Sequence, residues 1–369
     1  MATINDVARL AGVGLGTASR VVSGKGSVSP ATLERVKKAI EELDFRPSHA
    51  ARSLLSGTTK MIGVFIPVLK GTFYTHILQA IDNELRAAGL HMVVAFGVGA
   101  GDPRRQAIEG IEFLFERGCD GLLALTSHLN DADVAALGPK QNRLVVINHL
   151  VPSIPDQCFS ADHRHGGVLA ARALLEQQHR NIAVITGPAS SHDNVERIDG
   201  FLGELAAAGI DTASMWIAES DFSPQGGFDS ARELIEAKHD CTALFCANDE
   251  MAVGALSYFQ EAGVAVPGQL SVIAYDDTDS AAFSAPRLTS VHVPWRDVTL
   301  NGLNALLNLC YDTARPISRD FPITVTARAS LAPPSAAPSA APSAAPPASK
   351  QKPAAKAPAR SRSRNTSST

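Results

Sequence analysis

The sequence predicts an α/β protein that has a small all-α head, a larger body built on parallel β-sheets, and a disordered C-terminal tail. Residues 60–330 alternate short apolar runs with helical patterns, which is typical of parallel βαβ units covered by helices on both faces. Residues 1–46 show three short amphipathic helices and no strand pattern. Pro, Ala and Ser dominate residues 331–369, which hold almost nothing that could form a core.

Composition excludes several classes of protein. Of the 369 residues, 45% are apolar and 19% are charged, as in ordinary globular proteins. No apolar run reaches about 18 residues, so we expect no membrane span, and the charged N-terminus lacks the apolar stretch of a secretion signal. The five cysteines are scattered and lack zinc-ligand spacing. We therefore expect reduced thiols and a cytoplasmic location.

The net charge of −4 is unevenly distributed. Residues 1–60 hold nine Lys or Arg and five Asp or Glu, and residues 331–369 hold six basic residues and no acidic ones. The ends are therefore basic and the middle carries −14. This asymmetry predicts that a polyanion meets the ends of the chain. The tail is expected to be either a solubilising segment or a non-specific electrostatic tether to nucleic acid.

The head begins with a helix that Thr3 can cap, with Asp6 completing a capping box and Gly12 ending the helix. A second helix is expected at 15–22. A third is expected to start at Ser29, with Pro30 as its first residue and an apolar face from residue 33 to residue 43. The residues expected to face inward on the first two helices are Val7, Ala8, Leu10, Ala11, Ala18, Val21 and Val22.

A helix, a tight glycine turn and a second helix make a helix-turn-helix, whose second helix can lie in the major groove of DNA. On spacing alone, a plain helical bundle with a charged face remains the alternative.

In the body, strands are expected at 61–67, 91–96, 121–125, 143–147, 182–186, 243–246 and 270–275. Helices are expected between them at 75–88, 106–117, 166–177, 195–208, 226–236 and 249–261.

Polar residues directly after the expected strands are candidate ligand contacts, because such sheets bind ligands beyond the carboxyl ends of their strands. Asn148, Asn248 and Asp276 occupy such positions. Asp249 is expected mainly to cap the following helix, and Asp277 to cap or to form a salt bridge.

The sequence contains no convincing motif of an enzyme active site. Gly-rich stretches at 12–17 and 97–102 lack the strand context or spacing of a dinucleotide loop. His163, His165, His179 and His192 are too dispersed to predict a metal site, and surface or ligand-neighbouring histidines are the better interpretation. We expect no enzyme, no metal and no cofactor.

Four segments carry a resemblance to a known family: the head sequence TINDVARLAGVGLGTASRVVSGKG, the Phe45-Arg46-Pro47 motif that leads into the hinge, ANDEMAVGA and SVIAYDD. Through these segments the chain resembles the LacI/GalR family of bacterial sugar-responsive transcription regulators. The resemblance covers about residues 2–330. It implies a body of two lobes, like a periplasmic binding protein, and a nucleoid-associated location in a bacterium. The implied domains are a helix-turn-helix head (1–46), a hinge helix (47–59), an effector-binding body (60–330) and the tail (331–369). The implied lobes, joined by three crossovers, are 60–160 with 290–320 and 161–289 with 321–330.

The resemblance also implies which residues contact operator DNA. Leu15 and Gly16 occupy the two positions that choose bases. Leu54 matches a leucine that wedges into the minor groove, although alone it would be interpreted as a helix-packing leucine. The family usually has Ser where this chain has Gly14, and a glycine cap costs only a few tenths of a kcal/mol relative to Ser. The implied DNA-binding residues are Thr3, Leu15, Gly16, Thr17, Ser19, Arg20, Ser29, His49, Arg52 and Leu54.

For the body, the resemblance implies an effector site between the lobes. Its implied residues are Phe73, Asn148, Arg197, Phe222, Asn248, Asp276 and Trp295. Arg197 could otherwise be a surface helix residue, and Trp295 alone would more often belong to a core.

The sequence thus predicts a homodimeric regulator, expected to be a repressor, whose affinity for double-stranded operator DNA is controlled by a small carbohydrate. The tail lacks the leucine heptads that would favour a tetramer. The alternatives are an activator of the same family, a two-lobed sugar-binding protein without a regulatory role, and a sugar-processing enzyme.

Overall fold

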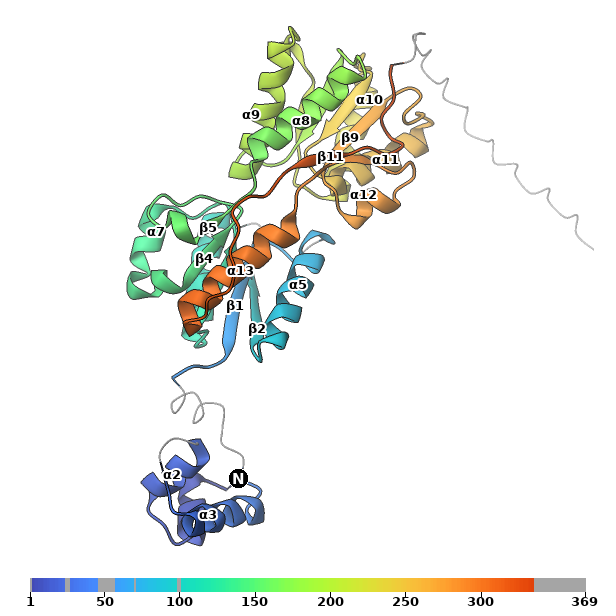
Figure 1. Ribbon diagram of the computed structural model, residues 1–369. Helices are drawn as coiled ribbons and strands as arrows, with labels where there is room; N and C mark the ends of the chain where they lie inside the picture. The colour runs from blue at the N-terminus through green and yellow to red at the C-terminus, as the bar shows by residue number, and fades with distance from the viewer. Residues whose placement is uncertain (1, 24–26, 46–56, 70, 98–100, 335–369) are drawn as a thin grey trace, which may run out of the picture. The chain divides into compact units, whose positions relative to one another are not determined.

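The computed structural model describes residues 2–23, 27–45, 57–69, 71–97 and 101–334. These residues form a three-helix head and a body of two α/β lobes, coloured from blue to red along the chain in Figure 1. Within these described ranges, no helix is both long enough and apolar enough to cross a membrane.

The head is a bundle of three helices that contact one another: α1 (Ile4–Leu10), α2 (Leu15–Ser23) and α3 (Pro30–Glu42). Thr3 caps α1 through the predicted capping box with Asp6, and Ser29 caps α3. Gly12 has a φ of 61°, so it ends α1 in the left-handed conformation as expected. The buried core of the head includes Val7, Ala11, Val36, Ala39 and Phe45.

The prediction that Leu10 of the head faces inward is wrong. Leu10 is 47% exposed. Val7 and Ala11, four residues apart on α1, instead supply its contact with the core. Ala18 is buried, and Val21 and Val22 pack against the core as expected.

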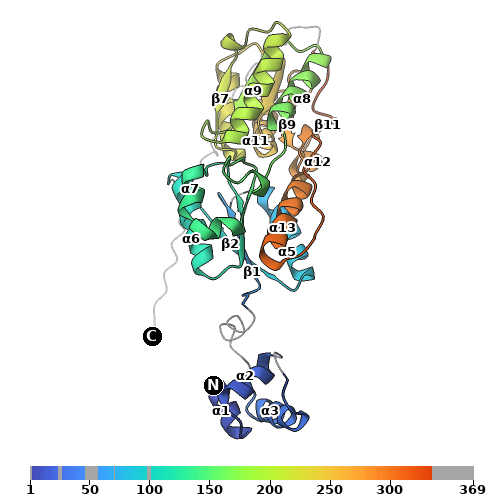
Figure 2. The ribbon, with the colours of Figure 1, turned by 60° about the vertical axis from the view of Figure 1, so that its left-hand side comes forward.

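Lobe 1 contains a five-stranded parallel sheet in the order β2-β1-β3-β4-β5. Its strands are β1 (Met61–Ile66), β2 (His91–Phe96), β3 (Gly121–Leu125), β4 (Leu144–Ile147) and β5 (Cys158–Phe159). Its helices are α5 (Phe73–Ala87), α6 (Pro103–Glu116), α7 (Asp131–Ala136) and, from the far end of the chain, α13 (Trp295–Tyr311), with 3-10 turns η1 (Gly138–Arg143) and η2 (Pro155–Gln157). Figures 1 and 2 show α13 alongside α5, with which it is in contact.

Lobe 2 contains a six-stranded sheet in the order β11-β10-β9-β8-β6-β7, parallel except for β11. Its strands are β6 (Ile182–Thr186), β7 (Ile217–Glu219), β8 (Ala243–Cys246), β9 (Ser271–Asp276), β10 (Thr289–His292) and β11 (Thr324–Thr326). Its helices are α8 (His163–Glu176), α9 (His192–Ala207), α10 (Pro224–Glu236), α11 (Asp249–Ala262) and α12 (Asp279–Phe283), with the 3-10 turn η3 (Thr212–Ser214).

The two lobes repeat one strand order, since β7-β6-β8-β9-β10 follows the same sequence as β2-β1-β3-β4-β5. In sheets of this order the direction of winding changes between the first and third strands, and ligands bind beyond the carboxyl ends there. The fold therefore places one such edge in each lobe, and the polar residues that end the strands lie along these edges.

The boundaries of the lobes differ slightly from those implied by the resemblance. The chain crosses between lobes at 160–162, 293–294 and 312–323. Thr289–His292 pairs with β9, so the second crossing follows residue 292 and not residue 289. At its C-terminal end, lobe 2 continues past the expected boundary at 330, because the carbonyl oxygen of Ala332 accepts hydrogen bonds from His179 and Ser271, both at 2.9 Å.

Candidate ligand site and head surface

A cavity of about 790 Å³ lies between the lobes and is lined by residues of both. Its walls include the carboxyl ends of β1, β3 and β4 in lobe 1 and of β8 and β9 in lobe 2, as the fold predicts. Residues that the sequence predicted as effector contacts all lie in this wall, namely Phe73, Asn148, Arg197, Phe222, Asn248, Asp276 and Trp295. The structure therefore brings together residues that are up to 222 positions apart in the chain.

Arg197, on α9, is only 2% exposed, so the interpretation as a surface helix residue is wrong. Its guanidinium carbon lies 3.6 Å from the centroid of the Tyr275 ring. One terminal nitrogen donates to the carbonyl oxygen of Ala247, and another lies 3.7 Å from the carboxylate of Asp193. The Nε atom is buried without a hydrogen-bond partner among the described residues. The charge is thus offset by Asp193, while one donor remains for a further acceptor.

A buried hydrogen-bonded chain runs from Asn148 in lobe 1 to His163 and Tyr275 in lobe 2. The Oδ1 atom of Asn148 lies 2.5 Å from Nε2 of His163, and Nδ1 of His163 lies 3.1 Å from the Tyr275 hydroxyl. Burial, with the neighbouring positive charge of Arg197, lowers the pKa of His163 to about 4. The imidazole is therefore neutral at pH 7. It donates from Nε2 to Asn148 and accepts at Nδ1 from Tyr275.

Aromatic rings and one carboxyl group form another part of the wall. Phe73 and Trp295 meet edge to face with ring centroids 5.2 Å apart. The Nε1 atom of Trp295 donates to Oδ1 of Asp276 at 3.2 Å, and burial raises the pKa of that carboxyl well above its usual range. Trp295 lines the cavity, so it is not simply a core residue. Apolar faces beside a few polar groups suit a ligand that carries both C–H surfaces and hydroxyls.

Three residues of the wall have backbone angles that non-glycine residues rarely adopt. The φ angles of Asn148, Phe222 and Asp276 are 68°, 62° and 104°. Each such conformation costs on the order of 1–3 kcal/mol and persists only where the surrounding structure enforces it. The cavity wall is therefore a place where backbone strain is stored.

The sequence-based roles of Asn248 and Asp249 need correction. Asn248, not Asp249, caps α11: its Oδ1 accepts from the backbone N–H of Met251 at 2.9 Å, and its Nδ2 donates to the carbonyl of Phe222 at 3.0 Å. Its extended backbone, with φ −152° and ψ 168°, is the geometry that a cap requires. Asn248 therefore orders the wall while lining it.

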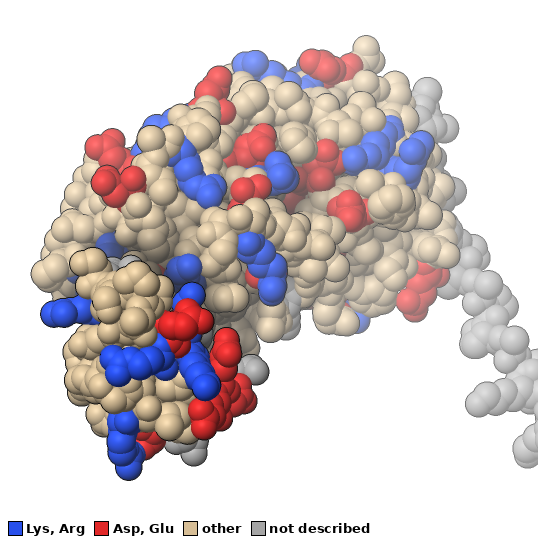
Figure 3. Space-filling model, turned by 60° about the horizontal axis from the view of Figure 1, so that its bottom comes forward, with Lys and Arg blue, Asp and Glu red and all other residues tan. Residues whose placement is uncertain are grey.

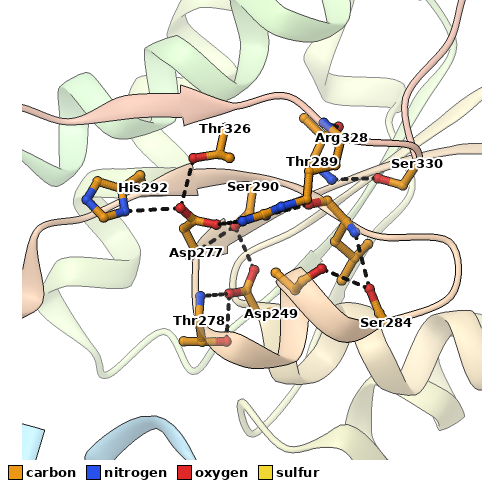
Figure 4. Close-up of polar contacts among 12 residues, drawn as sticks. Asp249, Asp277, Thr278, Ser284, Thr289, Ser290, His292, Thr326, Arg328 and Ser330 are labelled. Carbon is orange, nitrogen blue, oxygen red and sulfur yellow. Dashed lines mark hydrogen bonds and ion pairs between the residues drawn. The ribbon is translucent and has the colours of Figure 1, made fainter. Parts of the chain in front are cut away.

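Asp249 is buried and belongs to a polar network at the edge of lobe 2 (Figure 4). Its carboxylate accepts from the Ser290 hydroxyl at 2.6 Å and from the backbone N–H and hydroxyl of Thr278. Burial nevertheless raises its pKa to about 7. In the same network Asp277 forms the expected salt bridge, with Arg328 at 2.5 Å, and also contacts His292.

Sequence reasoning missed three acidic residues of the cavity wall, namely Asp193, Asp221 and Glu250. Asp193 precedes Arg197 by one helical turn, so the i, i+4 spacing of opposite charges could have revealed it. Glu250 accepts from the backbone N–H of Thr72 in the other lobe at 2.7 Å. The sequence carries no signal for that contact, because the two residues are 178 positions apart.

The residues that the resemblance assigns to DNA lie in different settings on the head. Leu15 is 49% exposed, and Gly16 and Arg20 are also exposed at the start and middle of α2. A Cβ atom on Gly16 would meet nothing within 4 Å. Thr17 and Ser19 are half-buried, while the side chains of Thr3 and Ser29 serve as helix caps. His49, Arg52 and Leu54 lie outside the described residues.

The start of α2 lacks the usual capping side chain. Gly14 stands there, and its carbonyl oxygen accepts the first helical hydrogen bond from Ala18 at 3.1 Å. Basic and acidic side chains are both exposed on the face of the head that Figure 3 shows. The exposed start of α2 therefore offers an apolar side chain and a glycine to an approaching surface.

Models of two protein families match the chain. Residues 3–48 match the model for bacterial regulatory proteins of the lacI family, and residues 171–331 match the periplasmic binding protein-like domain. Among curated proteins, the HTH-type transcriptional regulator GalR of Escherichia coli strain K12 is 32% identical over 338 residues, which cover 91% of this chain and 97% of GalR.

Solved structures of regulators are also similar. A transcriptional regulator of the LacI family from Burkholderia phymatum is 49% identical, with a TM-score of 0.71, covering 74% of this chain and 99% of that chain. The lac repressor dimer bound to operator and the anti-inducer ONPF is 27% identical, with a TM-score of 0.75 and coverage of 90% and 99%. The complex of the transcriptional regulator CelR with cellobiose is 29% identical, with a TM-score of 0.63 and coverage of 90% and 100%.

Proposed function

The chain belongs to the lacI family of bacterial transcriptional regulators. On this basis we propose that it is a repressor whose affinity for operator DNA is controlled by a small carbohydrate bound between its lobes. Its relatives are transcriptional regulators and not enzymes. The helix-turn-helix head binds the operator, and the two-lobed body binds the effector. Closure of the body around sugar moves lobe 1, separates the two hinges of a homodimer and releases the DNA.

The observation that carries this proposal is the composition of the cavity wall. Phe73, Phe222 and Trp295 supply apolar surface, while Asn148 and Asp276 supply acceptors and Arg197 supplies a donor. A carbohydrate needs this combination, because it presents hydroxyls around its edge and C–H groups on its faces. The cavity of about 790 Å³ lies in the size range of small-molecule sites. The related CelR structure holds cellobiose.

The operator-binding part of the proposal rests on the head. In a helix-turn-helix the N-terminal residues of the second helix meet base edges in the major groove, and α2 exposes Leu15 and Gly16 at that position. Thr17, Ser19 and Arg20 follow as base or phosphate contacts. The related lac repressor binds operator as a dimer, and we propose a homodimer on a palindromic site here. His49, Arg52 and Leu54 retain their proposed DNA contacts.

A thermal-shift screen tests the effector site. We expect a neutral monosaccharide or disaccharide to raise the melting temperature, since a ligand at 100 times its Kd stabilises the folded state by about 2.7 kcal/mol. Asp276→Asn keeps an acceptor for Trp295 but removes a carboxyl group from the wall, so we expect it to weaken that sugar about tenfold. Asp211→Asn, which changes an exposed capping aspartate of η3, is the matched control.

Two results would count against the proposal. If only sugar phosphates or nucleobases shift the melting temperature, the cavity is a ligand site but its ligand is not a neutral carbohydrate. If sugars, sugar phosphates and nucleobases all leave the melting temperature unchanged, the assignment of the cavity as an effector site is wrong.

A further inference from the structure

One carboxylate in lobe 1 holds the chain at the point where it arrives from the head. Asp120, just before β3, accepts from the backbone N–H of Thr59 and from that of Lys60, both at 2.8 Å. The Thr59 hydroxyl lies 3.0 Å from the same carboxylate and 2.6 Å from the carbonyl oxygen of Gly118. Lys60 has a φ of 59°, so the chain bends there into a conformation that costs energy and must be held. Asp120 thereby sets the direction in which the chain enters β1.

The same carboxylate is tied to the end of α13. Tyr311, the last residue of that helix, donates its hydroxyl to Oδ2 of Asp120 at 2.7 Å. The preceding residue, Cys310, approaches the Asp120 carbonyl oxygen at 3.5 Å. A hydrogen bond to a carboxylate is among the stronger ones in proteins. The arriving chain and the C-terminal end of α13 therefore share one anchor, which we call the Asp120 anchor (Thr59, Lys60, Asp120 and Tyr311).

The other end of α13 lies in the ligand cavity. Trp295, its first residue, lines the cavity and donates to Asp276 of lobe 2. Between its ends the helix packs on β3, β4 and α5, and at Gly302 it approaches β4 so closely that a Cβ would meet the side chain of Ile147, the neighbour of Asn148. Seventeen residues make a rod of about 25 Å. A tightly packed helix moves as a unit, so displacement of Trp295 reaches Tyr311.

A cavity beside the Asp120 anchor makes the hydrogen bond between Tyr311 and Asp120 more important. A second cavity of about 250 Å³ lies there, lined by residues that include Thr58, Lys60, Leu307 and Tyr311. Side-chain packing between α13 and residues 58–60 therefore leaves a gap, and the hydroxyl–carboxylate bond links the two segments beside it.

We propose that Tyr311 and Asp120 are positioning residues, which tie the cavity end of α13, through the length of the helix, to residues 59–60 that lead to the DNA-binding head. This inference rests on the proposed function and specifies how the effector site regulates the head. When ligand shifts Trp295, α13 moves the Asp120 anchor and redirects the chain that carries the head.

The test compares Tyr311→Phe with Tyr258→Phe in the full chain. Tyr258 is a half-buried tyrosine of α11 that packs edge-on against Phe228 in lobe 2, with ring centroids 5.2 Å apart, so it is a matched control for loss of one hydroxyl. The first readout is amide hydrogen exchange at residues 57–61 without ligand or DNA. We expect Tyr311→Phe to speed exchange there about tenfold and Tyr258→Phe to leave it unchanged. Unchanged exchange in Tyr311→Phe would overturn the proposed tie, whether or not the protein responds to sugar.

The second readout is coupling, measured as the ratio of operator Kd values with and without the sugar found by thermal shift. We expect Tyr311→Phe to bring this ratio close to one while its sugar Kd stays within twofold of the wild-type value. A merely structural role would lower the melting temperature without this selective loss. A wild-type ratio in Tyr311→Phe would contradict transmission through α13. A ratio of one in the wild-type protein would instead contradict the proposed function.

Discussion

The most constrained residues of the ligand cavity are those that end its strands. Asn148 follows β4 with a φ of 68°, and its side chain also bonds to His163. Asn tolerates the left-handed region better than most non-glycine residues, which explains this residue type at a position that must both turn the chain and present an amide. The sequence could place Asn148 at a strand end, but neither the strain nor its partner 15 residues away could be predicted.

Replacing Asn148 by Ala or by Gly separates strain from side-chain loss. Both variants remove the acceptor for His163, but only Ala keeps a Cβ in the left-handed conformation. We expect Asn148→Ala to be less stable than Asn148→Gly by about 1 kcal/mol. Urea unfolding of the two variants measures the difference. Equal stability would show that the positive φ imposes no cost here.

The raised pKa of the Asp249 carboxyl should make the free energy of unfolding depend on pH. Burial raises the pKa of its carboxyl from 3.8 to about 7. Between these values the folded state retains a proton that the unfolded state has lost, so its contribution to stability is complete below about pH 4 and is lost as the pH rises towards 7. We expect the unfolding free energy of the wild-type protein, relative to that of Asp249→Asn, to fall between pH 5 and 7. The slope is at most about 1.4 kcal/mol per pH unit. A difference that stays constant with pH, measured by urea unfolding, would contradict the assignment.

Among the elements of the described residues, the sequence predicted seven of the eleven strands and missed the short strands β5, β7, β10 and β11, and it did not predict how the helices pack. The observed β2, β3, β6 and β8 match the expected ranges, because buried parallel strands are short apolar runs with clear ends. Several helices begin two to three residues earlier than expected, at polar caps or prolines such as Asp102–Pro103 and Ser223–Pro224. The role of Asn248 was missed for a related reason, since either of two adjacent polar residues can cap and only backbone geometry decides between them.

Helices α8 and α9 pack closely enough to need glycine where they touch. A Cβ on Gly200 would meet the backbone carbonyl of Arg164, and one on Gly167 would meet the carbonyl oxygen of Arg197. This contact sets the position of α9 and hence of Arg197 in the cavity. The sequence shows the glycines but not what they approach, so the contact could not be predicted.

Gly200→Ala and Gly203→Ala form a matched pair on α9. A Cβ at residue 203 meets nothing within 4 Å, so we expect that variant to be unchanged or up to about 1 kcal/mol more stable. Gly200→Ala forces the helices apart and should cost about 2 kcal/mol. It should also weaken sugar binding by displacing Arg197. Thermal unfolding and ligand titration check both effects; if the two variants behave alike, the close approach does not position Arg197.

For the whole molecule, we propose a dimer in which each chain joins a sequence-specific head to a ligand-sensing body. The two-lobed body, and the seven predicted residues that line the cavity, followed from strand ends and from the family resemblance. The identity of the sugar did not, because a few ångströms of side-chain placement decide which hydroxyls are satisfied. Gly16 also leaves half of the proposed base-reading pair without a side chain, so the operator sequence does not follow from the sequence of α2.

Coupling between the two sites must be reciprocal if the sugar acts allosterically. We expect sugar to weaken operator binding by 5- to 150-fold, and operator to weaken sugar binding by the same factor. Fluorescence anisotropy of labelled operator and calorimetric titration of sugar, each with and without the other ligand, measure the two factors. Factors that differ would mean that the sugar and the DNA compete through some process other than this shared equilibrium.

Selection of binding sites from a pool of random DNA duplexes by the full-length protein, with and without the sugar, measures directly whether the sugar controls operator recognition. We expect a palindromic sequence to be enriched without sugar, because two heads of one dimer each read a half-site. We expect this enrichment to be lost when sugar is added. Absence of any enriched sequence, or enrichment of a site that lacks two-fold symmetry, would show that this protein is not a dimeric operator-binding regulator of the proposed kind.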